Sequence, residues 1–301
     1  MPRVRNWPQL AEPKFAGLVG VKAGMTSIAM IDDSEAPSKG SEIVRPATII
    51  EIPKVFIYGI RFYGTKIYKG AQAEAHDKVL AAKVGIKNSK GDLATIKQNL
   101  AKYNDVTALA FCDESNLGFG NKRVMRFEMP VGGKDLTEKV STIEQMLGKE
   151  LKLNNVLAPG EYVDVTTIST GKGWTGVIKR FGVSRLPRKA TGKVRHVGVL
   201  GAWHPARVLY SVPHAGHMGY NYRTEINKRV LKMGGPNDAS TVNAKGGFVN
   251  YGIVKNDFII LDGSIPGPAR RLVRIRKAIR NGRAVKVPNV TFVSTSSKQG
   301  A

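Results

Sequence analysis

Residues 165–224 contain neither Asp nor Glu, in a chain of 301 residues that has 23 acids elsewhere. The same stretch carries ten Lys and Arg residues and four of the five histidines, with glycines throughout and no apolar helical stripe through its middle. Because like charges repel and little apolar surface is available to bury, this stretch is not expected to fold compactly alone. A phosphate backbone would supply the missing negative charge and release counterions on binding, so the stretch predicts a polyanionic partner.

The positive charge of the chain is concentrated in its second half. Residues 171–301 hold 24 bases and 4 acids, which accounts for +20 of the net charge of +24. A basic half joined to a near-neutral half indicates either a nucleic acid or an anionic membrane as partner. The membrane is the weaker hypothesis, because the sequence has no apolar run of bilayer length and the basic half has no amphipathic helical pattern.

Two further observations bear on location. The opening Met1-Pro-Arg-Val-Arg5 is not followed by the apolar core of a signal peptide, and the chain has a single cysteine, Cys112, within an apolar run. One cysteine excludes a disulfide framework and a cysteine-rich zinc site, and a buried small side chain is its expected role. The protein is therefore expected to be intracellular.

The N-terminal region alternates in the manner of β-strands. Phe15–Lys22 and Met25–Ile31 predict the two limbs of a hairpin that turns at Ala23-Gly24. Asp32–Gly40 predicts a loop, and Val44–Ile52 predicts another strand because it is rich in β-branched residues.

The pattern from residue 60 to about 156 is that of an α/β insertion. Ile57–Phe62 and Thr107–Cys112 are typical of strands. Two apolar stripes predict amphipathic helices, with Asp92 and Asp135 where N-caps belong. The stripes are Leu93, Ile96 and Leu100, and Leu136, Val140, Ile143 and Leu147.

The β pattern returns after residue 157. Tyr162–Ser169 and Trp174–Phe181 predict strands on either side of a turn, and Tyr220–Met233 predicts a further extended segment. Gly246–Leu261 predicts two short strands, and Arg270–Ile279 alternates so that its bases would line a face in contact with water. Short strands on both sides of an α/β insertion indicate a mainly β fold whose N- and C-terminal segments assemble one closed β-barrel.

These patterns predict five parts. They are an N-terminal arm (1–14), a split β-barrel (15–59 and 157–293), an inserted α/β subdomain (60–156), an extended basic loop (184–218) and a flexible tail (294–301).

Gly171-Lys-Gly-Trp-Thr-Gly176 matches the G-x-G-x-x-G pattern of nucleotide-binding loops. Such a loop must end a strand and open a helix, whereas Val177–Phe181 has the composition of a strand and Trp174 is bulky for a turn that encloses phosphate. The kinase version also requires partner motifs that the chain lacks. A basic hairpin turn is the better interpretation.

The histidines His204, His214 and His217 raise the possibility of a metal or catalytic site. An H-x-x-H pair can bind zinc, but no nearby acid or cysteine completes the ligand set and the surroundings are cationic. Acid–base catalysis needs carboxylates or a His–acid couple, which an acid-free stretch does not supply locally. RNA contact or a structural role is the favoured interpretation.

Gly201-Ala-Trp-His-Pro-Ala206 is the most unusual motif of the stretch. A tryptophan usually fills a core. Here its neighbours are small or polar and its flanks are basic, so Trp203 is suited to stacking on a base or sugar.

Four motifs in order resemble the L-three family of large-subunit ribosomal proteins in its archaeal form. They are Gly20-Val-Lys-Ala-Gly-Met-Thr26, Thr170-Gly-Lys-Gly-Trp-Thr-Gly-Val-Ile-Lys-Arg-Phe-Gly182, Gly201-Ala-Trp-His-Pro-Ala-Arg-Val208 and Gly219-Tyr-Asn-Tyr-Arg-Thr-Glu225. The resemblance covers nearly the whole chain and implies a barrel of the translation-protein type, with an α/β insertion and a long loop.

The resemblance also implies a function. Such a protein is a non-enzymatic constituent of the large ribosomal subunit in the cytoplasm, binds 23S rRNA early in assembly and extends its loop towards the peptidyl transferase centre and the aminoacyl-tRNA site. Neighbours similar to L-fourteen and the L-twenty-four-type protein are implied, and no cofactor or metal. Trp203 would lie at the loop tip beside His204 and Arg207. The remaining expected RNA contacts are Lys172, Lys179, Arg180, Arg185, Arg188, Lys189, Lys193, Arg195, His196, Arg223 and Lys228. The alternative from another class is an RNA-modifying or RNA-hydrolysing enzyme that uses His204, His214 and His217.

Overall fold

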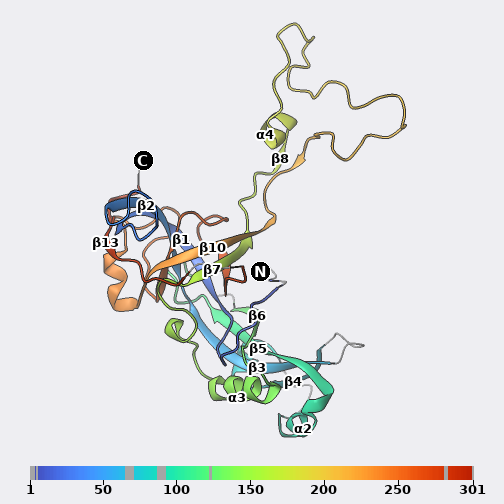
Figure 1. Cartoon of the computed structure of the whole chain (residues 1–301). Coiled ribbons are helices and arrows are strands. Elements are labelled where there is room, and N and C mark those ends of the chain that lie inside the picture. Colours follow the sequence, from blue (N-terminus) through green and yellow to red (C-terminus); the bar gives the residue numbers. More distant parts are fainter. Residues whose placement is uncertain are drawn as a thin grey trace. The chain divides into compact units, whose positions relative to one another are not determined.

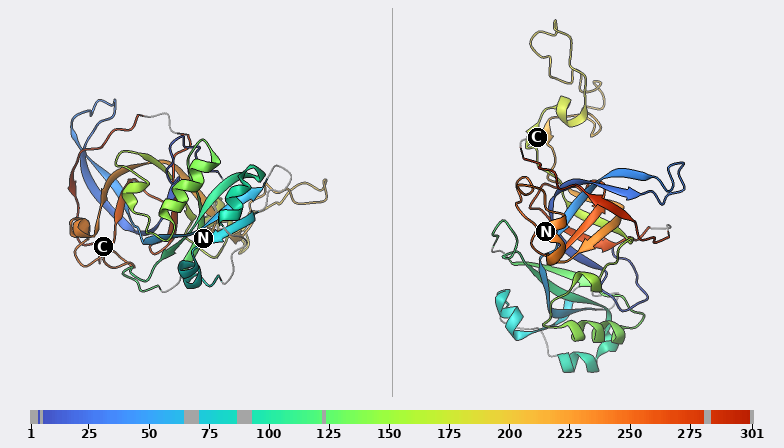
Figure 2. Two further views of the ribbon diagram at one scale, coloured as in Figure 1. Left: turned by 90° about the horizontal axis from the view of Figure 1, so that it is seen from below. Right: turned by 90° about the vertical axis from the view of Figure 1, so that its left-hand side faces the viewer.

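The computed structural model describes residues 4, 6–64, 71–86, 93–121, 124–280 and 284–299. The chain divides into two compact units. The first consists of Met1–Thr167 and Arg223–Ala301, and the second of Ile168–Tyr222. The first unit is mainly β and contains two sheets, which the right-hand view of Figure 2 shows as distinct bodies.

The larger sheet of the first unit has seven strands in the order β12-β7-β10-β11-β2-β1-β13, with an additional pairing between β12 and β1. Figure 1 labels β1, β2, β7, β10 and β13 of this sheet. Its neighbours come from both ends of the chain, because the N-terminal β1 pairs with the C-terminal β12 and β13. The strands are β1 (Gly17–Ile31), β2 (Glu42–Glu51), β7 (Tyr162–Ile168), β10 (Tyr222–Gly234), β11 (Phe258–Asp262), β12 (Leu272–Lys277) and β13 (Val290–Val293).

The predicted N-terminal hairpin is wrong, because β1 is one strand of 15 residues. Its pairing with β2 continues on both sides of a register shift between Lys22 and Gly24. Gly24 serves a close approach rather than a turn, since a Cβ there would lie 2.6 Å from the ring of Phe248. A bulge and a turn use the same small residues, and the partner strands decide between them. The loop at Asp32–Gly40 and the strand near Val44–Ile52 are confirmed.

The smaller sheet of the first unit is antiparallel, in the order β4-β3-β5-β6. Helix α3 packs on β3 and β5 and buries Val140 and Ile143. The remaining elements between residues 54 and 155 are β3 (Lys54–Gly64), β4 (Ala71–His76), α1 (Lys78–Lys83), α2 (Leu93–Gln98), η1 (Leu100–Lys102), β5 (Tyr103–Asp113), β6 (Val124–Pro130), α3 (Leu136–Met146) and η2 (Leu153–Asn155).

Both predicted helices of this region are confirmed. The stripe from Leu93 forms α2 and continues as the 3-10 helix η1, and the stripe from Leu136 forms α3. Asp135 occupies the N-cap of α3 without a side-chain hydrogen bond to the helix, and Asp92 lies outside the described residues.

The prediction of a wet basic face on Arg270–Ile279 is wrong. Strand β12 pairs with β1 on one edge and β7 on the other, and the side chain of Arg274 is buried. Arg276 and Lys277 instead form ion pairs with Asp164 and Glu161, at 2.9 and 3.0 Å. The pattern misleads because the acids that neutralise this strand lie more than 100 residues away in the sequence.

Only one of the two strands predicted in Gly246–Leu261 is present, and all of these residues are described. β11 forms at Phe258–Asp262, whereas residues 246–252 make turns closed by an isolated bridge between Phe248 and Gly252. The 3-10 helix η3 (Pro236–Thr241) precedes them.

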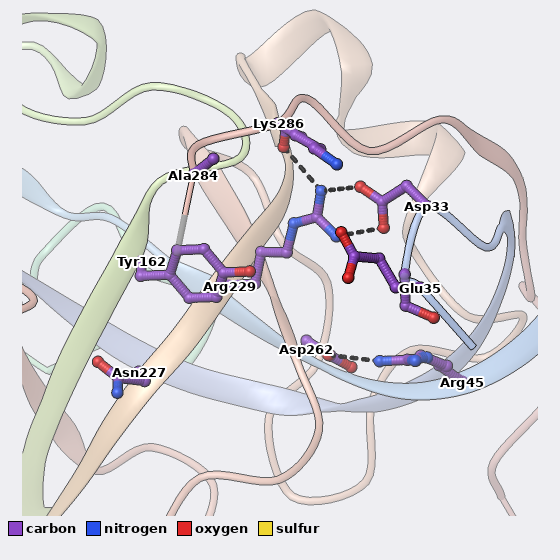
Figure 3. Close-up of a pocket in the computed structure, with 10 residues that line it drawn as sticks. Asp33, Glu35, Arg45, Tyr162, Asn227, Arg229, Asp262, Ala284 and Lys286 are labelled. Atoms are coloured by element: carbon purple, nitrogen blue, oxygen red, sulfur yellow. Dashed lines mark hydrogen bonds and ion pairs between the residues drawn. The ribbon is translucent and has the colours of Figure 1, made fainter. Parts of the chain in front are cut away.

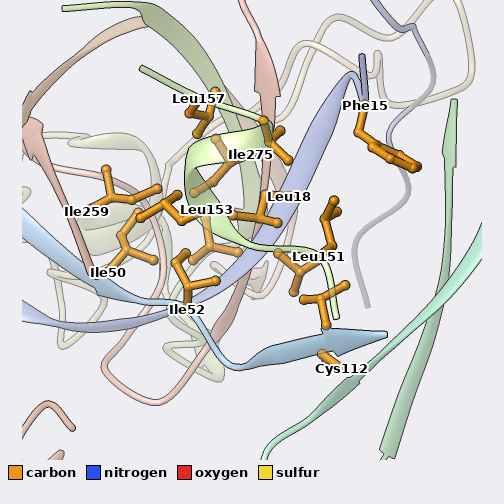
Figure 4. Close-up of a cluster of buried hydrophobic side chains, with 14 of the residues drawn as sticks. Phe15, Leu18, Ile50, Ile52, Cys112, Leu151, Leu153, Leu157, Ile259 and Ile275 are labelled. Carbon is orange, nitrogen blue, oxygen red and sulfur yellow. The ribbon is translucent and has the colours of Figure 1, made fainter. Parts of the chain in front are cut away.

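One hydrophobic core joins the two sheets of the first unit (Figure 4). It includes Leu18 of β1, Ile50 of β2 and Ile275 of β12, together with Leu151 and Leu153 from the segment after α3. Cys112 is buried in it as expected, and burial raises the pKa of its thiol to about 12, so the sulfur is unreactive at neutral pH.

Candidate nucleic-acid interface

The second unit, Ile168–Tyr222, begins and ends as an antiparallel neck. The backbone N–H of Ser169 donates to the carbonyl of Asn221 at 2.9 Å, and that of Lys172 donates to Met218 at 2.9 Å. Beyond these bonds β8 (Trp174–Thr175) pairs with β9 (Gly216–His217). Figure 1 shows the rest of the unit as a long irregular chain, with α4 (Val177–Phe181) beside β8.

The strand predicted at Trp174–Phe181 is wrong beyond Thr175, because Val177–Phe181 forms the one-turn helix α4. The helix starts after Gly176 and ends at Gly182, whose φ of 72° gives a left-handed C-cap. The β-branched Val177 and Ile178 have a high strand propensity. Burial of Val177 and the Gly182 cap nevertheless stabilise the helix.

The side chain of Arg180 connects separate segments of the second unit. Its guanidinium donates to the backbone carbonyl of His214 at 2.7 Å and its Cζ lies 5.0 Å from the ring centroid of Phe181. A Cβ at Gly216 would lie 2.8 Å from the Arg180 Nη1, so a side chain at this position would displace the guanidinium from its present place. Among the residues predicted to contact RNA, Arg180 therefore also has a structural role within the second unit.

The loop beyond α4 folds back on itself in tight turns. The N–H of Leu186 donates to the carbonyl of Val194 at 3.0 Å, and Thr191 and Gly192 adopt positive φ values of 49° and 75°. Arg188, Lys189 and Lys193 are exposed within this short segment between Leu186 and Val194.

Most of the predicted contact residues are exposed. Inside the second unit these are Lys172, Lys179, Arg185, Arg188, Lys189, Lys193, Arg195, His196, Trp203, His204 and Arg207. The unit contains nine Lys and Arg and no acid, so its charges have no carboxylate of the unit to neutralise them. The two other predicted residues lie on β10 in the first unit, where Arg223 is exposed and Lys228 is half-buried 3.8 Å from Glu225.

Trp203 is 88% exposed, with Val199 (86%) and Tyr210 (103%) also exposed nearby in the sequence. The interpretation of Trp203 as a core residue is therefore excluded. An indole held so open to water leaves apolar surface that a stacked base would cover.

The histidine cluster is not supported as a metal or catalytic site. No group of three His, Cys, Asp or Glu residues placed to hold a metal ion is present among the described residues. His214 is held by its backbone against Arg180, and His217 lies opposite Trp174 in the β8–β9 pair.

A charged pocket in the first unit was not predicted from the sequence (Figure 3). It has a volume of about 590 Å³ and lies between the loop after β1, strands β2, β7, β10 and β11, and residues 284–286. Arg229 donates to both carboxylate oxygens of Asp33 and to the carbonyl of Lys286, and Arg45 pairs with Asp262 at 3.2 Å. The Arg229 guanidinium holds the pKa of Asp33 below its ordinary value. The pocket's bases are thus largely neutralised, unlike those of the second unit.

These features define a mainly β protein that carries an acid-free cationic segment with exposed aromatic side chains. No helix within the described ranges is long and apolar enough to cross a membrane. The family profile of "Ribosomal protein L3" matches residues 1–300, and the chain belongs to this family.

Individual relatives agree over nearly the full length. The "Large ribosomal subunit protein uL3" of Methanobrevibacter smithii is 39% identical over 99% of this chain and 93% of its own length. Those of Methanoregula boonei and Methanocaldococcus jannaschii are 40% and 37% identical over 100% of this chain, covering 93% and 92% of their lengths. The relatives are named as ribosomal proteins rather than as enzymes.

Proposed function

We propose that the chain is a structural constituent of the large ribosomal subunit and binds 23S rRNA directly through its second unit. The observation that carries the proposal is the set of exposed bases on a segment that has no acid. In isolation those charges repel one another, and close contact with phosphates would both neutralise them and release counterions. Membership of the ribosomal protein L3 family supports the same assignment. The proposed location is therefore the cytoplasm.

The proposed scaffold for this segment is a closed β-barrel. The pairing of β12 with β1, added to the sheet order from β12 to β1, supports closure of the larger sheet on itself. We retain the division into an N-terminal arm at 1–14, barrel segments at 15–59 and 157–293, an inserted subdomain at 60–156 and a tail at 294–301. A barrel has no free edges except where β13 adds to β1, so it provides a rigid base for a loop without a core.

Within the second unit, the loop at 184–218 is proposed to penetrate the rRNA towards the peptidyl transferase centre and the aminoacyl-tRNA site. Its tip would be formed by Trp203 with His204 and Arg207. The exposure of all three side chains supports a tip that is ordered by rRNA rather than by the protein. Such ordering favours entry early in subunit assembly, while the rRNA can still close around the loop.

The near-neutral inserted subdomain at 60–156 is the surface proposed for protein neighbours similar to L-fourteen and the L-twenty-four-type protein. Ion pairs already neutralise many of its charges, as between Lys97 and Glu144 at 2.7 Å or Lys139 and Asp105 at 3.1 Å. Such a surface attracts phosphate less than the second unit does.

The test is the position of the tagged chain in ribosome fractions separated by sedimentation. We expect it in large subunits, where it should resist a high-salt wash. A variant with Arg188, Lys189, Lys193 and Arg195 changed to glutamine should be lost in that wash. Recovery of the wild-type chain outside ribosomal fractions would contradict the proposal.

A further inference from the structure

Trp174 and His217 face each other across the short β8–β9 ladder. They are direct partners in the antiparallel register, as are Thr175 and Gly216 one step along. Because residues directly opposite in an antiparallel pair project to the same face, Trp174 and His217 share one face and Thr175 and Gly216 share the other.

The Thr175–Gly216 face is filled from within the second unit. Thr175 and Gly216 are both buried, and the Thr175 hydroxyl lies 3.5 Å from the Gly216 carbonyl. The Arg180 guanidinium closes over Gly216 and ties this face to His214. The ladder therefore has a fixed inner side.

The other face is open. Trp174 is 79% exposed and His217 is also exposed. Tryptophan is among the residues that bury most surface in folded proteins, so an indole held outward on a braced strand is a candidate contact rather than a packing element. Gly173, with φ of 66°, lets the chain enter the strand in this orientation.

We propose that Trp174 and His217 form an aromatic platform on which one unpaired nucleobase of the rRNA stacks, at a site separate from Trp203. The inference rests on the proposed function. It assigns a role to the G-x-G-x-x-G motif, whose glycines shape the neck of a basic loop and whose tryptophan contacts a base.

Charge decides the kind of occupant. The nearest charged side chains in the sequence are Lys172, Lys179 and Arg180, and the whole unit has no acid, so a polyanion fits and a basic protein segment is repelled. A flat ring binds a base only if the base is unstacked from its neighbours, which is the state found in loops, bulges and single strands of RNA. Stacking on aromatic side chains is tolerant of sequence, so the site selects an unpaired nucleotide and not a particular base.

The experiment uses the full chain and its rRNA, with tryptophan fluorescence as the direct readout. The chain has three tryptophans, so the variant Trp7→Phe with Trp203→Phe leaves Trp174 as the only indole. We expect rRNA to quench its emission strongly, and heparin, a polyanion without bases, to bind without quenching. Trp7→Phe with Trp174→Phe reports on Trp203 in the same way.

Affinity measurements give the second readout. Trp174→Ala should weaken rRNA binding by about tenfold, within the range for one stacked base, and should leave the salt dependence unchanged. Trp174→Phe should retain much of the affinity and His217→Ala should lose part of it. Lys172→Ala is the matched control, since loss of a phosphate contact should reduce the salt slope by about 0.7–0.9.

Unquenched Trp174 emission in the rRNA complex, together with wild-type affinity of Trp174→Ala, would overturn the platform. Quenching by heparin to the same extent would also overturn it, because no base would then be required. Neither result affects the proposed function, which fails if the wild-type chain shows no salt-dependent affinity for the rRNA or is recovered outside ribosomal fractions.

Discussion

Arg274 of β12 lies over the indole of Trp7, with its guanidinium carbon 5.3 Å from the ring centroid. The same guanidinium lies 5.6 Å from the ring of Phe127 and donates to the carbonyl of Glu128. Burial lowers the pKa of Arg274 to about 10, which still leaves it charged at neutral pH. A buried cation thus connects the N-terminal residues, β6 and β12 within the first unit.

We predict that Arg274→Ala destabilises the free protein by at least about 2 kcal/mol, because it removes the hydrogen bond of a buried guanidinium to the carbonyl of Glu128 and two cation–π contacts. Trp7→Ala should cost less, about 0.5–2 kcal/mol. Denaturant unfolding measures both. Arg207→Ala, an exposed arginine of the loop, is the control and should stay within about 0.5 kcal/mol of wild type. Equal stability of Arg274→Ala and Arg207→Ala would show that the buried guanidinium contributes nothing.

A second prediction concerns pH and the Asp33–Arg229 pair (Figure 3). The pKa of Asp33 is lower in the folded state than in the unfolded chain, so the pair stabilises the fold above the ordinary Asp value of about 3.9. That stability is lost as the pH falls through the folded value. Asp33→Asn should therefore be less stable than wild type by about 1.5 kcal/mol at pH 6, with the difference shrinking towards pH 3.

The control for this pH series is Glu35→Gln, which neutralises an exposed carboxylate lining the same pocket. Its stability should follow that of wild type at every pH within about 0.5 kcal/mol. A difference between wild type and Asp33→Asn that does not change with pH would mean that the charge of Asp33 is not the stabilising feature.

The third prediction is a steep salt dependence of rRNA binding. If about six bases of the second unit meet phosphates, the slope of log affinity against log salt should be near −5, at about 0.9 per phosphate. Changing Arg188, Lys189 and Lys193 to glutamine should make the slope less negative by about 0.9 for each base in contact. The same change at Lys97 and Lys139, which form ion pairs in the first unit, should leave it unaltered. A wild-type slope between zero and −1 is incompatible with the account.

The fourth prediction is that the loop at 184–218 is mobile in the free protein. Its residues bury little apolar surface, so nothing offsets the entropy lost on ordering. Hydrogen exchange should leave the amides of 184–218 unprotected outside the ladder residues 216–218, which pair with residues 172–175, and should protect β7, which is buried and paired to β12. Similar protection of both segments would contradict the prediction.

An element can be predicted from the sequence when the contacts that determine it join residues close together in the chain. It cannot when those contacts join distant residues. The stripes at Leu93 and Leu136 predict their helices because helix periodicity is local. The continuity of β1 through Gly24 depends on its pairing with β2, and the buried Arg274 contacts the distant Trp7, so neither follows from a local pattern.

The candidate interface shows the same division. Its charge and the absence of acids are visible in the sequence, and the high exposure of Trp203 agrees with the expectation that it is not a core residue. The role of Arg180 as an internal brace depends on glycines at 182 and 216, and a one-turn helix among β-branched residues gives no periodic signal. The pocket at Arg229 is assembled from six separate parts of the chain, which no sequence pattern brings together.

The most direct test of the central claim is aminoacyl-tRNA binding by large subunits that carry Trp203→Ala. The bases that would anchor the loop lie outside the tip, so these subunits should sediment normally and contain the variant in full amount. Loss of one stacking contact, about 1–3 kcal/mol, should shift the local rRNA conformation by between about fivefold and about 150-fold and alter aminoacyl-tRNA binding accordingly. Trp203→Phe should retain part of the wild-type behaviour, because a smaller ring remains. Normal aminoacyl-tRNA binding by fully assembled Trp203→Ala subunits would contradict the claim that this loop reaches the catalytic centre through Trp203.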